Sequence, residues 1–182
     1  MKEIDKLFAQ LYNTYIDDLY AYGKALGVSY ENLQDAIHDV FLSVIDHYNY
    51  LRLDENIKYY LLKSLKNKII SNARKKVEYD DISYADEYNF SIKVTGLEIL
   101  IEEEERNRLV NTIEKMLNLL TPRQREAIYL RYMQELSYEE IAKVLNITEK
   151  GARKLVSRAV IELRDKQILL LFIILCVMLK DL

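Results

Sequence analysis

The sequence has little of what stabilises secreted or turn-rich proteins. Its one cysteine, Cys176, excludes an intramolecular disulfide and favours a reducing, cytoplasmic compartment. One proline and four glycines in 182 residues disfavour a β architecture with many tight turns. The first ten residues lack the apolar core of a signal peptide, so secretion is not expected. Half of the residues are hydrophobic, so the chain can form apolar cores without disulfides. Because proline and glycine are so few, an all-α fold is predicted.

Acidic and basic residues are unevenly distributed along the chain, although the net charge is only −3. Residues 63–76 contain six basic residues and no acid, and residues 77–105 contain ten acids and one base. Residues 143–166 contain seven basic and three acidic residues. The small net charge therefore conceals two basic segments separated by an acidic one, and basic segments of this kind are typical of nucleic-acid contacts.

The spacing of apolar residues predicts three helices in the first part of the chain. Apolar residues recur at steps of three and four from Phe8 to Leu26, from Leu33 to Tyr48 and from Ile57 to Ile69. Three such helices can share one core, so residues 1–76 are predicted to form a small helical domain. The period is lost in residues 77–97, and the four glutamates 102–105 are predicted to begin a new helix. Residues 77–105 as a whole are predicted to be an acidic linker.

Residues 106–166 are predicted to form a second small domain of four helices. Residues 121–124 (TPRQ) and 137–140 (SYEE) have the form of capping boxes, each of which begins a helix. Thr148 is predicted to cap the last helix. Residues 167–182 then follow as an apolar C-terminal tail.

Residues 137–164 have the features of a helix-turn-helix. Ala142 is small enough for two helices to cross closely, Asn146 tolerates the left-handed conformation of the turn, and Ile147 can fill the space beneath it. The second helix is predicted to bury Ala152, Val156, Ala159, Val160 and Leu163. Its opposite face carries the predicted DNA-binding residues Lys150, Arg153, Lys154, Ser157 and Arg158. The alternative is an ordinary amphipathic hairpin with a solvated charged face.

The run from Thr121 to Arg164 resembles the fourth conserved region of bacterial sigma factors of the extracytoplasmic-function class, within the sigma-70 family. Independently, Asp35–Phe41 resembles the helix of that family that grips the clamp of the largest RNA polymerase subunit. Tyr60–Lys76 resembles the helix that recognises the minus-ten promoter element. The resemblance implies a sigma factor that binds core RNA polymerase and promoter DNA, needs no cofactor, is not an enzyme and has an anti-sigma protein as a partner.

The resemblance also implies roles for residues of the first domain. The polymerase-binding residues would be Asp35, His38 and Asp39. The DNA-binding residues of this domain would be Lys63, Lys66, Asn67, Arg74, Lys75 and Lys76. The cations suit phosphates and an asparagine can read adenine. Ordinary surface charges, and a solvated polar side chain at Asn67, are the alternatives that stay open.

The sequence departs from the usual wording of the family at three sites. His38 replaces a glutamine, residues 150–153 (KGAR) replace a run of small residues, and Tyr59-Tyr60 replaces a tryptophan pair. Because of the first two departures, the promoter sequence cannot be predicted by analogy. In the loop 49–56, Tyr50 could stack on a base flipped out of the DNA, or it could be one more surface tyrosine.

No catalytic or metal site is predicted. The pair Asp35-x-x-His38 lacks the second acid-x-x-His pair that a helical di-metal site needs. No phosphate-binding glycine loop and no nucleophile–histidine–acid set is found. The rival interpretations are a dimeric helix-turn-helix regulator of operators and a helical protein-interaction module.

The tail and the linker leave alternatives open. The twelve apolar residues 168–179 would span roughly 18 Å as a helix, against roughly 30 Å for the hydrocarbon core of a bilayer, so membrane insertion is not expected. The tail needs a cover, which could be either domain, an anti-sigma protein or a second copy of the chain. It could be a structural helix or an autoinhibitory element. The linker could follow the RNA channel of the polymerase, or it could be a solubilising spacer.

Overall fold

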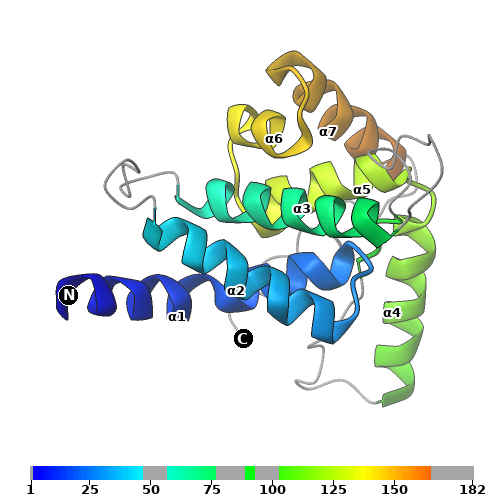
Figure 1. Cartoon of the computed structure of the whole chain (residues 1–182). Helices are drawn as coiled ribbons and strands as arrows, with labels where there is room; N and C mark the ends of the chain where they lie inside the picture. Colours follow the sequence, from blue (N-terminus) through cyan, green and yellow to red (C-terminus); the bar gives the residue numbers. More distant parts are fainter. Residues whose placement is uncertain (1, 47–56, 77–88, 93–102, 165–182) are drawn as a thin grey trace. The chain divides into compact units, whose positions relative to one another are not determined.

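The computed structural model describes residues 2–46, 57–76, 89–92 and 103–164. Every regular element among these residues is helical, which confirms the predicted all-α fold (Figure 1). Internal contacts divide the chain into two units, Met1–Asn89 and Phe90–Leu182. The predictions made for Tyr50, for residues 77–88 and for the apolar tail fall outside the described residues.

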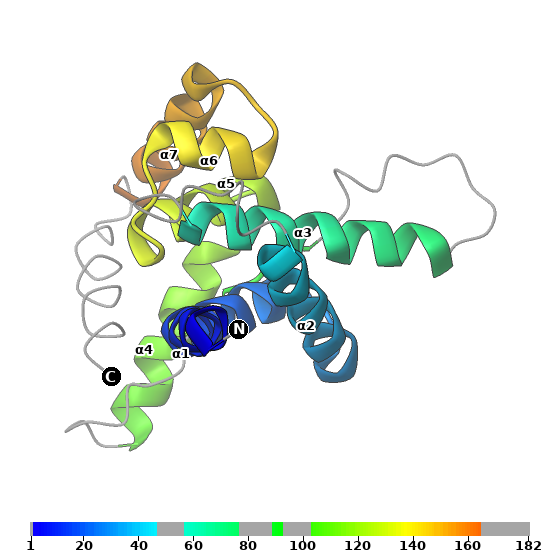
Figure 2. The ribbon, with the colours of Figure 1, turned by 60° about the vertical axis from the view of Figure 1, so that its left-hand side comes forward.

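The first unit consists of three helices that contact one another: α1 (Lys2–Ala25), α2 (Tyr30–Asp46) and α3 (Ile57–Lys76). Figure 2 views α1 nearly end-on, with α2 and α3 beside it. The shared core is formed by the apolar faces that the spacing predicted. Its buried members include Leu19, Tyr22, Leu26, Leu33, Ile37, Val40, Phe41, Val44, Ile57, Leu61, Leu62 and Leu65. Ile69, at the end of the predicted stripe, is only half-buried.

A close approach of α1 to α2 depends on Gly23. A Cβ atom at this position would collide with the side chain of Leu33, which is completely buried. We expect Gly23→Ala to destabilise the first unit by about 1–3 kcal/mol, because it adds volume to a packed contact. Thermal melting followed by helical circular dichroism measures the change.

Gly151→Ala provides the matched control for this prediction. A Cβ there would lie 3.3 Å from Thr148 Oγ1 and no closer to any other atom, so alanine is expected to be tolerated or to stabilise the helix by up to about 1 kcal/mol. Equal melting temperatures for Gly23→Ala and the parent protein would show that the contact between α1 and Leu33 can relax.

The second unit contains α4 (Glu103–Leu117), α5 (Pro122–Ile128), a π-helical turn η2 (Tyr129–Met133), α6 (Tyr138–Leu145) and α7 (Glu149–Arg164). In both ribbon views α6 and α7 lie together on one side of α5, and α7 contacts both of the other helices (Figures 1 and 2). The buried residues include Ile113, Leu117, Leu120, Ala127, Ile128, Leu130, Leu136, Ile141, Val144, Leu145, Ala152, Val156, Ala159 and Leu163.

Both predicted capping boxes are confirmed. The Thr121 hydroxyl accepts a hydrogen bond from the Gln124 amide at 3.2 Å, and the Gln124 side chain accepts one from the Thr121 amide at 2.9 Å. Ser137 and Glu140 exchange the equivalent bonds at 3.2 and 2.7 Å. Each box satisfies amides that would otherwise lack partners at a helix start.

The turn between η2 and α6 was not predicted. The Gln134 amide donates to the Tyr129 carbonyl at 3.1 Å, which closes the π-helical turn, and the buried Gln134 side chain donates to the Tyr129 hydroxyl at 3.1 Å. Glu135 then adopts a left-handed conformation with φ 59°. This conformation is rare for a residue with a side chain, and it redirects the chain into α6.

Residues 89–92 also depart from the sequence analysis, which assigned them to an uninterrupted linker. Phe90 is completely buried and Ile92 is 9% exposed. The Phe90 ring meets the Tyr129 ring edge-on, with centroids 5.4 Å apart. Part of the predicted linker therefore packs on the second unit, whereas α4 begins at Glu103, within the run of glutamates that is predicted to begin a helix.

Candidate nucleic-acid interface

The turn between α6 and α7 has the geometry that a helix-turn-helix requires. Asn146 is left-handed, with φ 52° and ψ 52°, as predicted. The Ile147 amide donates to the Ala142 carbonyl at 3.0 Å, and Ala142 itself is buried at 6% exposure. The Thr148 hydroxyl accepts from the Gly151 amide at 3.1 Å, which is the predicted cap of α7. These local bonds fix the direction in which α7 leaves the turn.

The two faces of α7 differ in chemistry. Ala152, Val156, Ala159 and Leu163 are buried, as predicted. Val160 is half-buried, so the expectation that it would join the buried face is only partly met. All five predicted DNA-binding residues of this helix are exposed: Lys150, Arg153, Lys154, Ser157 and Arg158. The exposed face therefore offers four cations and a hydroxyl along the helix.

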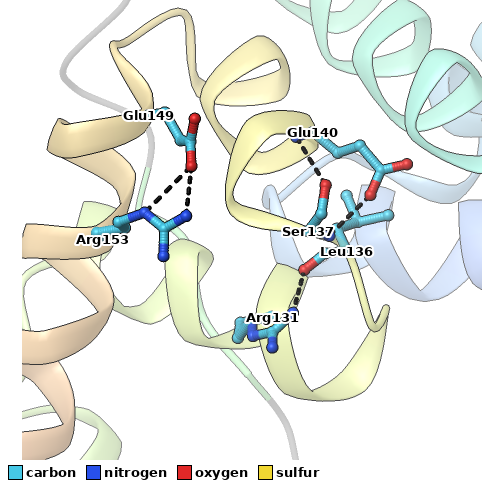
Figure 3. Close-up of polar contacts among 6 residues, drawn as sticks. All are labelled: Arg131, Leu136, Ser137, Glu140, Glu149 and Arg153. Carbon is cyan, nitrogen blue, oxygen red and sulfur yellow. Dashed lines mark hydrogen bonds and ion pairs between the residues drawn. The ribbon is translucent and has the colours of Figure 1, made fainter.

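Arg153 is held in place by two neighbours. Its Nε donates to Glu149 Oε1 at 3.1 Å and its Nη2 donates to the same oxygen, one helical turn earlier (Figure 3). The guanidinium carbon also lies 4.5 Å from the ring centroid of Tyr138, the first residue of α6. An ion pair and a cation–π contact thus fix a side chain that would otherwise be mobile.

Tyr138 is approached by a second cation, Arg131 of η2. The Arg131 guanidinium carbon lies 4.9 Å from the same ring centroid. Its Nη1 donates to the Leu136 carbonyl at 2.8 Å (Figure 3). Further along α6, the hydrogen bond and the charge of Lys143 lower the pKa of the Glu139 carboxyl, which is 2.7 Å away.

On the first unit, α3 brings several predicted DNA-binding residues onto one stripe. Lys63, Asn67 and Arg74 follow one another at steps of four and seven residues; Lys63 is half-buried and the other two are exposed. Lys66 is 7% exposed, whereas an exposed cation was expected. Lys75 and Lys76 belong to the last turn of α3, but their side chains lie outside the described part of the structure.

The predicted polymerase-binding residues lie together on α2. Asp35, His38 and Asp39 are exposed, and Leu42 continues the same face with 45% exposure. Asp39 also forms an ion pair with Lys68 of α3, with Oδ2 and Nζ 2.6 Å apart. We call these four residues the α2 face.

Several side chains of these surfaces were missed in the sequence analysis. The spacing of Glu149 and Arg153 is a visible signal, because opposite charges four residues apart pair on a helix. Leu42 is an apolar residue at a position that the helical period places outside the core. No sequence signal marks Tyr138 as a neighbour of Arg153, because the two belong to different helices.

Within the described ranges, no group of three or more side chains suitable for a metal ion is found. No helix in that same part of the chain is long and apolar enough to cross a membrane.

A helix-turn-helix with a cationic recognition helix defines the second unit as a DNA-binding unit of an all-α protein. Comparison with known families makes the class specific. Residues 11–78 match Sigma-70 region 2 and residues 111–163 match Sigma-70, region 4. The chain therefore belongs to the sigma-70 family, whose members direct promoter recognition.

Two solved structures have a similar fold. The sigma factor RpoE of Bartonella quintana, solved in complex with the anti-sigma factor NepR, has 22% sequence identity and a TM-score of 0.61. That match covers 88% of this chain and 96% of the other. CnrH, solved with the cytosolic domain of CnrY, has 18% identity and a TM-score of 0.56, over 90% and 88% of the two chains. A comparison with curated proteins gave no significant match.

Proposed function

We propose that this chain is a sigma factor of the extracytoplasmic-function class that binds core RNA polymerase in the cytoplasm and places it on promoter DNA. The observation that carries the proposal is the combination, in one chain and in the family order, of two surfaces. The first unit has the α2 face, and the second has a cationic recognition helix. A simple operator-binding regulator would need only the second.

The α2 face is the proposed polymerase contact. Two carboxylates, an imidazole and an exposed leucine can combine charge complementarity with an apolar contact, as protein interfaces commonly do. The ion pair between Asp39 and Lys68 links this face to α3. A polymerase contact at Asp39 would therefore also affect Lys68 of α3, the helix that carries the proposed DNA stripe.

The stripe on α3 is the proposed contact to the minus-ten element. Lys63 and Arg74 would neutralise phosphates, and Asn67 between them could read an adenine. Lys66, Lys75 and Lys76 belong to the same proposed site. Strand opening here needs no covalent chemistry, since single-stranded bases held more tightly than paired ones shift the equilibrium towards the open form.

Helix α7 is the proposed contact to the minus-thirty-five element. In a helix-turn-helix the first turns of the second helix reach base edges in the major groove, and the later cations meet phosphates. Lys150, Arg153 and Lys154 lie in the first turns, with Ser157 and Arg158 one turn later. All five are exposed and available for such contacts.

The domain limits and the inhibitory partner remain part of the proposal. Residues 1–76 would bind polymerase and melt DNA, residues 106–166 would bind the upstream element, and residues 77–105 would connect them, with Phe90 as an anchor on the second unit. The chain would end in the apolar tail 167–182. An anti-sigma protein is proposed as a partner because the similar sigma factor RpoE was solved with one.

Transcription in vitro with core RNA polymerase on a library of genomic DNA tests the function. We expect initiation at discrete sites that core polymerase alone does not use. The double variant Lys150→Glu/Lys154→Glu should lose site selection but retain the complex with core polymerase, since its substitutions lie on α7 and not on the α2 face. The matched control is Lys115→Glu, an exposed cation on α4.

A dimeric regulator or a helical interaction module would give a different result. Neither would form a stoichiometric, salt-resistant complex with core polymerase. Absence of that complex, together with unaltered initiation when the chain is added, contradicts the proposed function.

A further inference from the structure

Arg153 is the cation of α7 whose guanidinium is fixed from two sides. Glu149 Oε1 accepts from its Nε and Nη2, and the Tyr138 ring lies against it at 4.5 Å. Tyr138 is itself held near Arg131, which is tied to the Leu136 carbonyl. The contacts run from the turn before α6, through the first residue of α6, to the first two turns of α7.

This arrangement leaves specific hydrogen-bonding groups available on the outer side. The side chain of Arg153 is 58% exposed and that of Glu149 is 47% exposed. The ion pair uses Nε and Nη2, which leaves Nη1 and the second hydrogen of Nη2 as two parallel donors. Among the described residues, no hydrogen bond to Glu149 Oε2 is found, so this oxygen remains an acceptor.

The chemistry of these groups matches two bases. Two parallel guanidinium donors fit O6 and N7 of guanine, and a carboxylate oxygen accepts from the N4 amino group of cytosine. Glu149 is the first residue of α7 and Arg153 lies one turn later, in the part of a recognition helix that reaches base edges. A lone carboxylate there would be repelled by phosphates, but the paired guanidinium offsets this repulsion.

We infer that Glu149 and Arg153 act as one preformed reading pair that selects a cytosine and a neighbouring guanine in the upstream promoter element, with Tyr138 as the positioning residue of Arg153. This inference rests on the proposed function in one respect, namely that α7 enters the major groove. The pair specifies bases through both partners, whereas Arg158, one turn later, supplies a phosphate contact.

A competition experiment tests the pair. The protein, in complex with core polymerase, selects from duplexes randomised over the upstream element, and sequencing gives the preference at each base position. Glu149→Gln is expected to lose the preference for cytosine at one position, because the amide nitrogen that replaces Oε2 only donates and cannot accept from N4 of cytosine, while the amide oxygen stays paired with Arg153. We expect the preference for cytosine over the other bases at that position to fall by about tenfold or more.

The opposite result is equally clear. If Glu149 acts only by repelling DNA, Glu149→Gln will tighten binding to every sequence alike and leave all base preferences unchanged, which overturns the inference. Glu104→Gln is the matched control, since Glu104 forms the same type of ion pair with Arg108 on exposed α4, with atoms 2.6 Å apart. This control is expected to leave every preference unchanged.

Tyr138 is tested through the preference at the guanine position. Tyr138→Phe keeps the ring and should retain the preference, whereas Tyr138→Leu should reduce it towards the value for Arg153→Ala. Because two DNA sequences compete for the same protein, a smaller folded fraction of either variant cancels from the ratio. Equal preferences in the leucine and phenylalanine variants would overturn the positioning role.

The outcome is separable from that of the proposed function. One possible result is that the chain binds no core polymerase, but that Glu149→Gln still changes base preference as expected when the protein is tested alone on the duplex library. This result would contradict the proposed function and support the reading pair. A chain that initiates at promoters, but whose Glu149→Gln variant keeps all preferences, would support the proposed function and overturn the reading pair.

Discussion

Replacement of Phe90 by alanine is expected to destabilise the second unit by about 3–5 kcal/mol, the usual loss for a buried phenylalanine. Phe90 is completely buried, and its ring packs edge-on against Tyr129 at 5.4 Å. Tyr129 begins the π-helical turn, and its hydroxyl accepts from the buried Gln134 side chain. The loss of Phe90 would therefore leave a cavity beside the turn that leads into α6.

Thermal and urea unfolding of the full chain measure this effect. A loss of 3–5 kcal/mol is a large part of the stability of an ordinary small domain, so the helices of the second unit should melt well before those of the first. Promoter binding should fall steeply on warming, while base preference at low temperature, where the unit is folded, should be retained. Leu119→Ala is the control, because Leu119 is a large apolar residue of the same unit with 47% exposure.

If Phe90→Ala unfolds like Leu119→Ala, residues 89–92 do not contribute to the second unit. The boundary between the two units would then have to be drawn closer to α4, as the uninterrupted acidic linker of the sequence analysis implied. Ser91 and Ile92 line a small hollow with Asn118 and Arg125. If residues 89–92 did not pack on the second unit, this hollow would lose two of its lining residues.

The helices of this protein could be predicted from the sequence because their signals are local. Thr121 is followed three residues later by a glutamine, and Ser137 is followed three residues later by a glutamate. The two partners of each capping box therefore lie within four consecutive residues. Asn146 is likewise a residue whose own chemistry permits the turn. Such features need no knowledge of distant parts of the chain.

The features that were missed depend on contacts between distant residues or on irregular backbone. Phe90 lies among acidic and polar residues without helical period, and its partner Tyr129 is far away in the sequence. The π-helical turn at residues 129–133 contains apolar residues that suit an ordinary helix equally well. Nothing in the sequence around Glu135 indicates that a glutamate adopts positive φ there.

For the candidate site, the exposed faces could be predicted from the sequence, but the pairing of their side chains could not. The helical period separates the exposed cations of α7 from its buried face, and it places Asp35, His38 and Asp39 on one side of α2. It does not show which of these charged side chains already form ion pairs within the protein. Asp39 pairs with Lys68, and Arg153 pairs with Glu149. These pairings decide what a charge reversal would change.

Charge reversal on the α2 face is expected to weaken the binding of core RNA polymerase by about thirtyfold or more, which corresponds to an interface residue worth about 2 kcal/mol. Asp35→Lys tests this directly, since no ion pair of Asp35 is found among the described residues. Competition with labelled parent protein for core polymerase measures the affinity. Asp17→Lys, on an exposed position of α1, makes the same change of charge outside this face and is the control.

Asp39→Lys needs a further variant, because it also places two lysines side by side. The double variant Asp39→Lys/Lys68→Glu restores an internal ion pair with the charges exchanged. The original pair joins side chains that are 46% and 37% exposed, so it contributes at most about 1 kcal/mol to the stability of the first unit. If Asp39 contacts polymerase, the double variant should remain as defective in binding as Asp39→Lys, with normal helix content. Restored binding in the double variant would assign Asp39 to the packing of α2 on α3 and leave Asp35, His38 and Leu42 as the polymerase contact.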